Sequence, residues 1–202
     1  MGDPAAPRAP IRPSQSTPMS LTMEHHDGHR PPGQRRVHHV KVLVTAASRH
    51  GATTEIAATI GTVLTSAGHQ VTVEHPESIE SVAGYDAVVM GSAVYMGRWM
   101  EAARELVERE KPALERIPVW LFSSGPVGDP PAPAEESVDE QPLVDLVNAR
   151  GHRVFGGDIE KSKLGFGERA IMAAVRAPEG DFRPWPEIEA WASEIAASLN
   201  MA

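Results

Sequence analysis

The feature that most constrains the fold is a series of short, strand-like runs that are apolar throughout and alternate with helical stretches. The expected strands are residues 42–46, 71–73, 86–91, 118–123 and 152–156. Strands that are apolar on both faces are typical of parallel sheets with helices on each side. Right-handed crossovers then give a three-layer α/β/α sandwich. Five strands fit a doubly wound sheet of order 2-1-3-4-5.

The segments between these runs have helical periodicity. The expected helices are residues 53–66, 98–110, 143–150, about 167–175 and 185–199. Residues 126–141 are rich in proline and acids and are expected to form a loop. Residues 1–39 hold seven of the 18 prolines and no apolar periodicity, which predicts a disordered tail. The chain is therefore expected to divide into this tail and one folded domain over residues 40–200.

Composition excludes several classes of function. The formal net charge of −8 argues against nucleic acid as a partner. The absence of cysteine excludes disulfides, thiolate metal sites and a cysteine nucleophile. We expect no transmembrane segment and a cytoplasmic protein, with at most a peripheral contact at the inner face of the membrane. We predict no metal site, since the tail histidines suit a polar linker better; they are His25, His26, His29, His38 and His39.

The first expected strand runs into a loop of small residues, TAASRHGAT at 45–53. Gly51 can adopt a conformation closed to other residues, and the N–H groups at the start of the next helix would then converge on one point. Ser48 and Thr53 add hydroxyl groups. This pattern favours a phosphate site, and the alternative is an ordinary turn capped by Ser48 or Thr53.

Two further loops follow the third and fourth expected strands, at the same end of the sheet. In GSAVYMGRW at 91–99, Tyr95 and Trp99 could offer a flat face to a planar ligand, or could simply pack against the next helix. In SSGPVGD at 123–129, a sharp turn could close over the other side of a ring, or could be a plain loop. Ligands of doubly wound sheets bind at this end.

These residues resemble a known family. SRHGAT at 48–53 is similar to the flavodoxin phosphate loop, and GSAVYMG at 91–97 and SSGPVG at 123–128 resemble the loops that flank the flavin ring. KLGFGERAIMAAV at 163–175 and FRPWPEIEAWASEI at 182–195 resemble the menaquinone-dependent protoporphyrinogen oxidase branch. The resemblance covers about residues 41–199 and implies a flavodoxin-like sandwich that binds FMN without a covalent bond.

The resemblance places the cofactor on all three loops. The predicted FMN-binding residues are Ser48, Arg49, His50, Gly51, Ala52, Thr53, Ser92, Ala93, Val94, Tyr95, Met96, Gly97, Ser123, Ser124, Gly125, Pro126, Val127, Gly128 and Asp129. His50 stands where flavodoxins often have threonine, and Arg49 could pair with the phosphate. No catalytic residue is predicted, because the flavin supplies the redox chemistry.

The family branch implies an oxidoreductase that passes electrons from a porphyrinogen-like substrate to a quinone. The segment with Lys161, Lys163, Arg169 and Arg176, together with Phe166, Ile171 and Met172, could meet a carboxylated macrocycle or an anionic membrane surface. The alternative is an ordinary amphipathic helix on the sheet.

Two other functions stay open with the same fold. One is an electron-transfer flavodoxin that serves a redox partner protein, and the other is an NAD(P)H-dependent quinone reductase whose donor binds directly over the flavin.

Other site types fit the sequence poorly. A phosphoacceptor domain needs an aspartate where the third strand ends, but Asp86 begins that strand. The spacing G-x-G-x-x-A at 165–170 follows the fifth strand with no βαβ unit after it. His69, His75 and His152 fall near strand starts or in connections and are expected at the surface.

Overall fold

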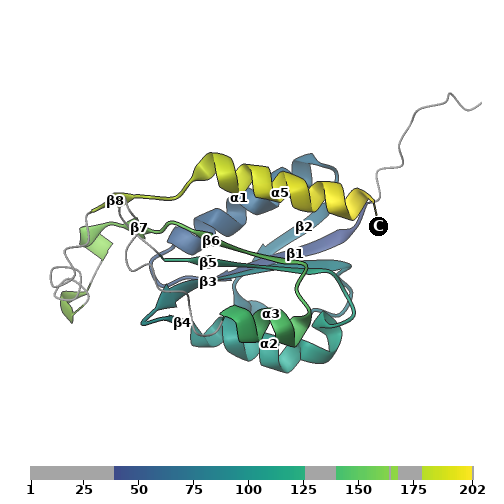
Figure 1. Ribbon diagram of the computed structural model, residues 1–202, viewed down its shortest axis with the longest axis horizontal. Coiled ribbons are helices and arrows are strands. Elements are labelled where there is room, and N and C mark those ends of the chain that lie inside the picture. The colour runs from purple at the N-terminus through teal and green to yellow at the C-terminus, as the bar shows by residue number, and fades with distance from the viewer. Residues whose placement is uncertain (1–38, 126–139, 164, 168–178, 202) are drawn as a thin grey trace, which may run out of the picture. The chain divides into compact units, whose positions relative to one another are not determined.

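Five parallel strands form the central sheet (Figure 1). The computed structural model describes residues 39–125, 140–163, 165–167 and 179–201. The strands are β1 (Lys41–Ala47), β2 (Gln70–Glu74), β3 (Ala87–Tyr95), β5 (Val119–Ser124) and β6 (Gly151–Phe155). Their order, β2-β1-β3-β5-β6, confirms the predicted order 2-1-3-4-5. A short strand that was not predicted, β4 (Arg98–Trp99), pairs antiparallel with the end of β3.

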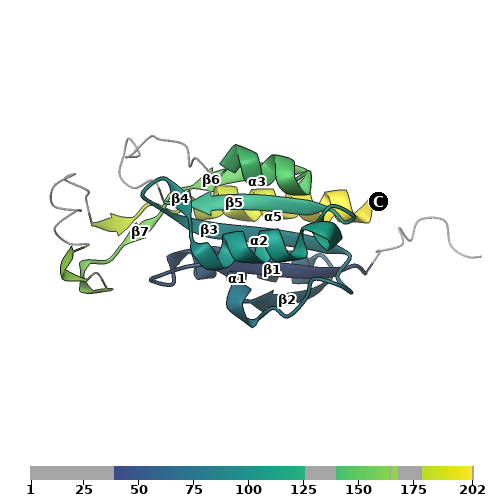
Figure 2. The ribbon, with the colours of Figure 1, turned by 90° about the horizontal axis from the view of Figure 1, so that it is seen from below.

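Helices cover both faces of this sheet. They are α1 (Ala52–Ser66), α2 (Glu101–Leu114), α3 (Glu140–Val147) and α5 (Trp185–Asn200), with 3-10 turns η1 (Pro76–Ser78) and η2 (Lys161–Lys163). Helices α1 and α5 lie on one face, and α2 and α3 lie on the other (Figures 1 and 2). Along β1, Val42 and Val44 pack toward α1 and α5, whereas Leu43 packs toward α2 and α3. This alternation of apolar residues confirms the predicted three-layer sandwich.

An aromatic cluster fills the core between the sheet and α5. Phe122 of β5, Phe155 of β6 and Trp191 of α5 lie with ring centroids 5.7–6.2 Å apart. Phe122 is the cross-strand neighbour of Gly91 on β3, and its ring covers that glycine. A Cβ atom at position 91 would lie only 2.1 Å from the ring, so the core requires glycine there.

Several boundaries differ from the prediction. Strand β3 continues to Tyr95 rather than ending at Gly91, because small buried residues extend it. Helix α2 begins three residues later than expected and continues to Leu114, with Pro112 inside it. Helix α3 begins earlier, at Glu140. Nearly all of the helix predicted at about 167–175 and of the loop predicted at 126–141 lies outside the described residues.

His69 is buried, which corrects the predicted surface position. Only 4% of the residue is exposed, and neither ring nitrogen has a hydrogen-bond partner among the described residues. Gly68 has a φ of 96°, and the N–H of His69 donates to the carbonyl of Leu64 at 3.2 Å. The chain therefore turns back directly at the end of α1, and residue 69 lies at the junction with β2.

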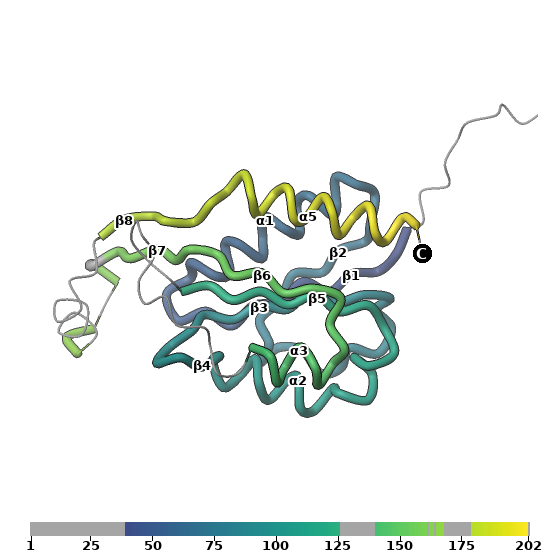
Figure 3. The backbone as a smooth tube through the Cα atoms, viewed as in Figure 1, coloured from purple at the N-terminus to yellow at the C-terminus, as the bar shows by residue number. Residues whose placement is uncertain are grey.

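A two-stranded neck follows β6 (Figure 3). Strands β7 (Asp158–Ile159) and β8 (Gly180–Asp181) pair antiparallel, and the N–H of Phe182 donates to the carbonyl of Gly157 at 2.9 Å. A Cβ atom at Gly156 would lie 2.0 Å from the carbonyl oxygen of Phe182. The chain leaving β6 and the chain entering α5 are therefore in close contact.

Glu110 of α2 holds the segment that follows η1. Its carboxylate accepts hydrogen bonds from the N–H of Val82 at 3.0 Å and from the hydroxyl of Ser81 at 3.2 Å. These contacts, the one from Val82 foremost, hold the pKa of Glu110 below its usual value. The folded state therefore favours the ionised carboxylate.

Glu110→Gln is expected to lower the unfolding free energy at pH 7 by roughly 1–2 kcal/mol, because a charged acceptor is lost. Since the pKa is lower in the folded state, this stabilisation is full above the unfolded pKa and disappears as pH falls through the folded value. Urea denaturation of both proteins between pH 7 and pH 3 measures it. Glu115→Gln, at an exposed ion pair with Lys111, is the control and should change little. If the difference in unfolding free energy between the unaltered protein and Glu110→Gln is as large at pH 3 as at pH 7, this account is wrong.

Candidate functional site

The three predicted loops meet at one edge of the sheet, where β1, β3 and β5 end. Strand register places Ala47 beside Ser92 and Ser92 beside Ser123. The guanidinium of Arg49, in the first loop, lies 5.9 Å from the ring centroid of Tyr95, in the second. The structure thus brings residues 48–53, 92–97 and 123–125 together, as the sequence predicts.

The first loop directs main-chain donors at one point. Gly51 has a φ of 92°, in the left-handed region, and precedes the first residue of α1. The Ser48 hydroxyl oxygen accepts the N–H of Gly51 at 3.0 Å and the N–H of Thr53 at 3.2 Å. Ser48 therefore caps the turn, as the alternative interpretation expected. The same two donors lie at the positive end of the α1 dipole, and an oxyanion that displaced the Ser48 hydroxyl would meet both of them.

A hollow of about 430 Å³ lies beside this loop. It is lined by Ser48, Arg49, Gly51, Thr54, Glu55, Ala58 and His75. The Thr54 hydroxyl is buried and has no hydrogen-bond partner among the described residues. An unsatisfied buried hydroxyl is costly, and a ligand oxygen or an ordered water can satisfy it.

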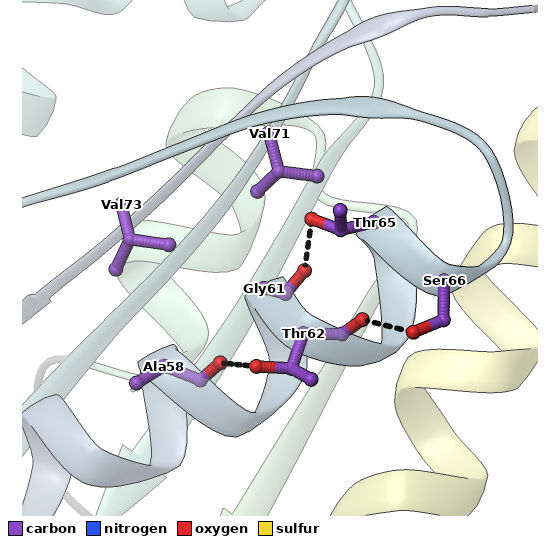
Figure 4. Close-up of a pocket in the computed structure, with 7 residues that line it drawn as sticks. All are labelled: Ala58, Gly61, Thr62, Thr65, Ser66, Val71 and Val73. Atoms are coloured by element: carbon purple, nitrogen blue, oxygen red, sulfur yellow. Dashed lines mark hydrogen bonds between the residues drawn. The ribbon is translucent and has the colours of Figure 1, made fainter.

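A second hollow of about 410 Å³ continues along α1 and β2 (Figure 4). The Thr65 hydroxyl donates to the carbonyl of Gly61, and the Ser66 hydroxyl donates to that of Thr62. These hydroxyls are occupied within the helix, and Val71 and Val73 form the opposite wall. This hollow offers apolar surface and does not resemble a site for a charged cofactor.

The second loop is a tight hairpin between β3 and β4. Ser92, Ala93, Val94 and Tyr95 lie in β3, and Met96 and Gly97 form the turn with φ values of 51° and 72°. Met96 is 98% exposed and Tyr95 is 38% exposed. Tyr95 can thus offer a ring face at this edge.

Trp99 packs in the core with α2, which confirms the second of the two alternatives for this residue. It is only 2% exposed, and its indole N–H donates to the hydroxyl of Ser123 at 2.9 Å. The turn at Met96 and Gly97 reverses the chain, so that β4 carries this side chain back into the core.

Buried serine hydroxyls join the elements beneath the site. Ser92 donates to the carbonyl of Ala93 at 2.8 Å and accepts the N–H of Met100 at 2.8 Å. The hydroxyl of Ser123 also lies 3.0 Å from Nε2 of His152, whose ring is largely buried rather than at the surface. Ser92 and Ser123 are fully buried, so their side chains brace the sheet edge from inside.

No sequence pattern indicates the contact between Ser123 and His152, because these residues are 29 positions apart and meet only through the pairing of β5 and β6. Glu140 of α3 also approaches, with its Oε1 atom 4.0 Å from Nε2 of His152.

Part of the predicted site lies outside the described residues. Gly125 follows β5 and packs beside Val94, but Pro126, Val127, Gly128 and Asp129 lie outside the described residues. The same holds for four residues of the basic and apolar segment, which are Arg169, Ile171, Met172 and Arg176. Of that segment's described residues, Lys163 pairs with Glu160 at 2.6 Å and Phe166 is exposed.

The geometry defines a class of protein: a doubly wound α/β domain in which the loops after β1, β3 and β5 meet at the end of the sheet where ligands of such domains bind. The family described as Flavodoxin domain matches residues 43–183. The chain belongs to this family. Membership implies FMN binding, in agreement with the sequence-based prediction.

Known proteins resemble the chain in sequence and in fold. The protoporphyrinogen IX dehydrogenase [quinone] of Escherichia coli (strain K12) is 23% identical over 172 residues, which cover 78% of this chain and 95% of that protein. A flavodoxin from the domain Archaea superposes with a TM-score of 0.56 at 12% identity, over 79% of this chain and 98% of the other. A flavodiiron core from Synechocystis sp. PCC6803 superposes with a TM-score of 0.57 at 17% identity, over 83% of this chain and 38% of the other. The two structures support the fold.

Within the described part of the chain, every helix is too short or too polar to cross a membrane.

Proposed function

We propose that the protein is an FMN-dependent oxidoreductase that passes electrons from a reduced organic substrate of the porphyrinogen class to a quinone. The observation that carries this proposal is the match to the Escherichia coli protoporphyrinogen IX dehydrogenase [quinone], because it spans 95% of that enzyme. A similarity confined to the cofactor loops would support FMN binding but not this particular reaction.

The FMN phosphate binds at residues 48–53 in this proposal. The N–H groups of Gly51 and Thr53 already converge on the Ser48 hydroxyl oxygen, whose place a phosphate oxygen would take, and Thr54 is among the residues that line the adjoining hollow. These donors suit a phosphate monoester, and Arg49 adds a positive charge nearby. The role of the chain in this loop is to hold the phosphate and so fix the position of the whole cofactor.

The flavin ring lies between segments 91–97 and 123–129 in this proposal, with Tyr95 against one side. When bound, FMN supplies the electron transfer between donor and acceptor. The chain contributes a rigid edge, because the buried hydroxyls of Ser92 and Ser123 fix the ends of β3 and β5. The exposed Met96 offers apolar surface to a macrocycle, to a quinone or to the inner face of a membrane that holds the quinone.

The direct test is porphyrinogen oxidation without oxygen. FMN-loaded protein is mixed with protoporphyrinogen and a soluble menaquinone analogue, and porphyrin fluorescence is followed. We expect fluorescence to rise only when protein and quinone are both present. A rate equal to that of free FMN at the same concentration would refute the proposal.

A second candidate is a carrier flavodoxin that exchanges electrons with a partner protein in the cytoplasm. It is favoured by the archaeal flavodoxin, 98% of which superposes on this chain. If the protein is a carrier, its chemically reduced, FMN-loaded form should pass electrons to a redox protein such as cytochrome c. The oxidised form should not oxidise porphyrinogen. The NAD(P)H-dependent quinone reductase is tested in the same cuvette, by adding NAD(P)H in place of porphyrinogen.

A further inference from the structure

Arg183 joins the end of the neck to the first turn of α1. It follows β8, and its side chain is only 6% exposed. Its Nη1 atom donates to the carbonyl of Ala52 at 3.2 Å and to the carboxylate of Glu55 at 2.7 Å. Its Nε and Nη2 atoms donate to the carboxylate of Asp181 at 2.7 and 2.8 Å. One guanidinium thus links segments 128 or more residues apart in sequence.

The setting of Arg183 holds this guanidinium in place. Its Cζ atom lies 4.5 Å from the ring centroid of Trp185, at the start of α5. Asp158 and Asp181 are cross-strand partners in the neck, and the guanidinium lies 4.0 Å from the first and in contact with the second. Hydrogen bonds from Arg183 hold the pKa of Asp181 below its usual value. The guanidinium is therefore a fixed charge that faces several carboxylates.

The contact with Glu55 bears on the cofactor. Glu55 lies in the first turn of α1, and it lines the hollow beside the phosphate loop. A carboxylate at this position favours an isolated helix, but it repels a dianionic phosphate held at the same helix N-terminus. Arg183 forms an ion pair with this carboxylate and also bonds the carbonyl of Ala52, which belongs to the predicted phosphate loop.

We propose that Arg183 is a positioning residue for the cofactor phosphate. It neutralises Glu55 and anchors the first turn of α1, so that the converging N–H groups of the loop can hold a dianion. The segment after β6 thereby sets how strongly the protein distinguishes a phosphorylated flavin from an unphosphorylated one. This inference rests on FMN binding, which family membership implies, and is independent of the porphyrinogen reaction.

The test compares FMN with riboflavin, which lacks the phosphate. Apo protein and its Arg183→Gln variant are titrated with each flavin, and binding is measured by quenching of flavin fluorescence. We expect the variant to bind FMN about tenfold more weakly because Glu55 is left uncompensated, and to bind riboflavin unchanged. Added salt should reduce the difference in FMN affinity between the unaltered protein and the variant, because it screens the charges.

Two further variants separate electrostatics from general damage. Glu55→Gln alone should strengthen FMN binding about threefold, since the Arg183 charge is then less compensated. The double variant Glu55→Gln/Arg183→Gln should recover most of the lost affinity for FMN. Arg153→Gln removes an equal charge at an exposed pair with Glu194 on α5, and should leave both flavins unaffected.

Each outcome is decisive. Equal weakening of FMN and riboflavin by Arg183→Gln, or no recovery in the double variant, would overturn the proposal and leave Arg183 a structural residue. If Arg183→Gln does not fold, weaker FMN binding by the Glu55→Gln variant would overturn it as well. Failure of the unaltered protein to bind FMN would instead count against the cofactor, which separates the two results.

Discussion

Replacing Gly51 by valine is expected to weaken FMN binding by about a hundredfold or more. Gly51 has a φ of 92°, which a β-branched residue adopts only at high cost. Nothing lies within 4 Å of a Cβ atom built at this position, so the cost comes from the backbone alone. The loop would relax to another conformation, and the N–H groups of Gly51 and Thr53 would no longer converge. Titration of the apo protein with FMN measures the loss.

Gly84 provides a matched control for this experiment. It has a φ of 97°, also with open space around it, but it lies before β3 at the opposite edge of the sheet. Gly84→Val should therefore carry a similar backbone penalty in thermal unfolding and leave FMN affinity intact. Unchanged affinity in Gly51→Val, or an equal loss in both variants, would show that the loop is not the phosphate site.

Gly91→Ala is expected to lower the unfolding free energy by about 3 kcal/mol. The added methyl carbon would lie 2.1–2.4 Å from three ring atoms of Phe122. The ring cannot move aside freely, because Phe155 and Trp191 pack around it. Because the core is closely packed, β3 and β5 would have to move apart to relieve this overlap. Urea denaturation followed by tryptophan fluorescence measures the change.

The control for Gly91→Ala is another strand glycine. A Cβ atom at Gly151, on β6, would lie 3.6 Å from Trp120, an ordinary contact, so Gly151→Ala should change stability by under about 1 kcal/mol. The double variant Gly91→Ala/Phe122→Leu should recover part of the loss, since leucine is smaller. Full stability in Gly91→Ala alone would mean that Phe122 has room that its packing does not suggest.

The sequence predicted the sheet and the meeting of the three loops at one end of it because both depend on local patterns. Apolar runs and the Gly51 turn are properties of a few neighbouring residues. The predicted end of β3, at residue 91, was wrong because that prediction also used only a local pattern. Serine, alanine and glycine are typical of loops, yet Ser92 is satisfied inside the strand by the carbonyl of Ala93 and the N–H of Met100. Nothing in the local pattern reveals a hydroxyl satisfied by a residue beyond the next turn.

Individual side-chain contacts between distant segments could not be predicted. For Trp99 the sequence left open a surface for a planar ligand or packing against the next helix, and neither alternative included the bond from its indole N–H to Ser123, 24 residues away. Arg183 reaches Glu55 across 128 positions. Such pairs depend on the exact register of neighbouring strands and on how far each helix runs, and neither is fixed by residue spacing.

The neck between β7 and β8 has a consequence for how this chain can vary. Residues 157 and 182 are joined by a hydrogen bond, and β7 and β8 pair directly beyond them. The two ends of everything inserted between them are thus already brought together. Lengthening, shortening or exchanging that insert need not strain β6 or α5, because closing a surface loop costs little more as it grows. The neck is therefore a position at which related flavin-binding proteins can carry inserts of different length and sequence while their cores stay the same.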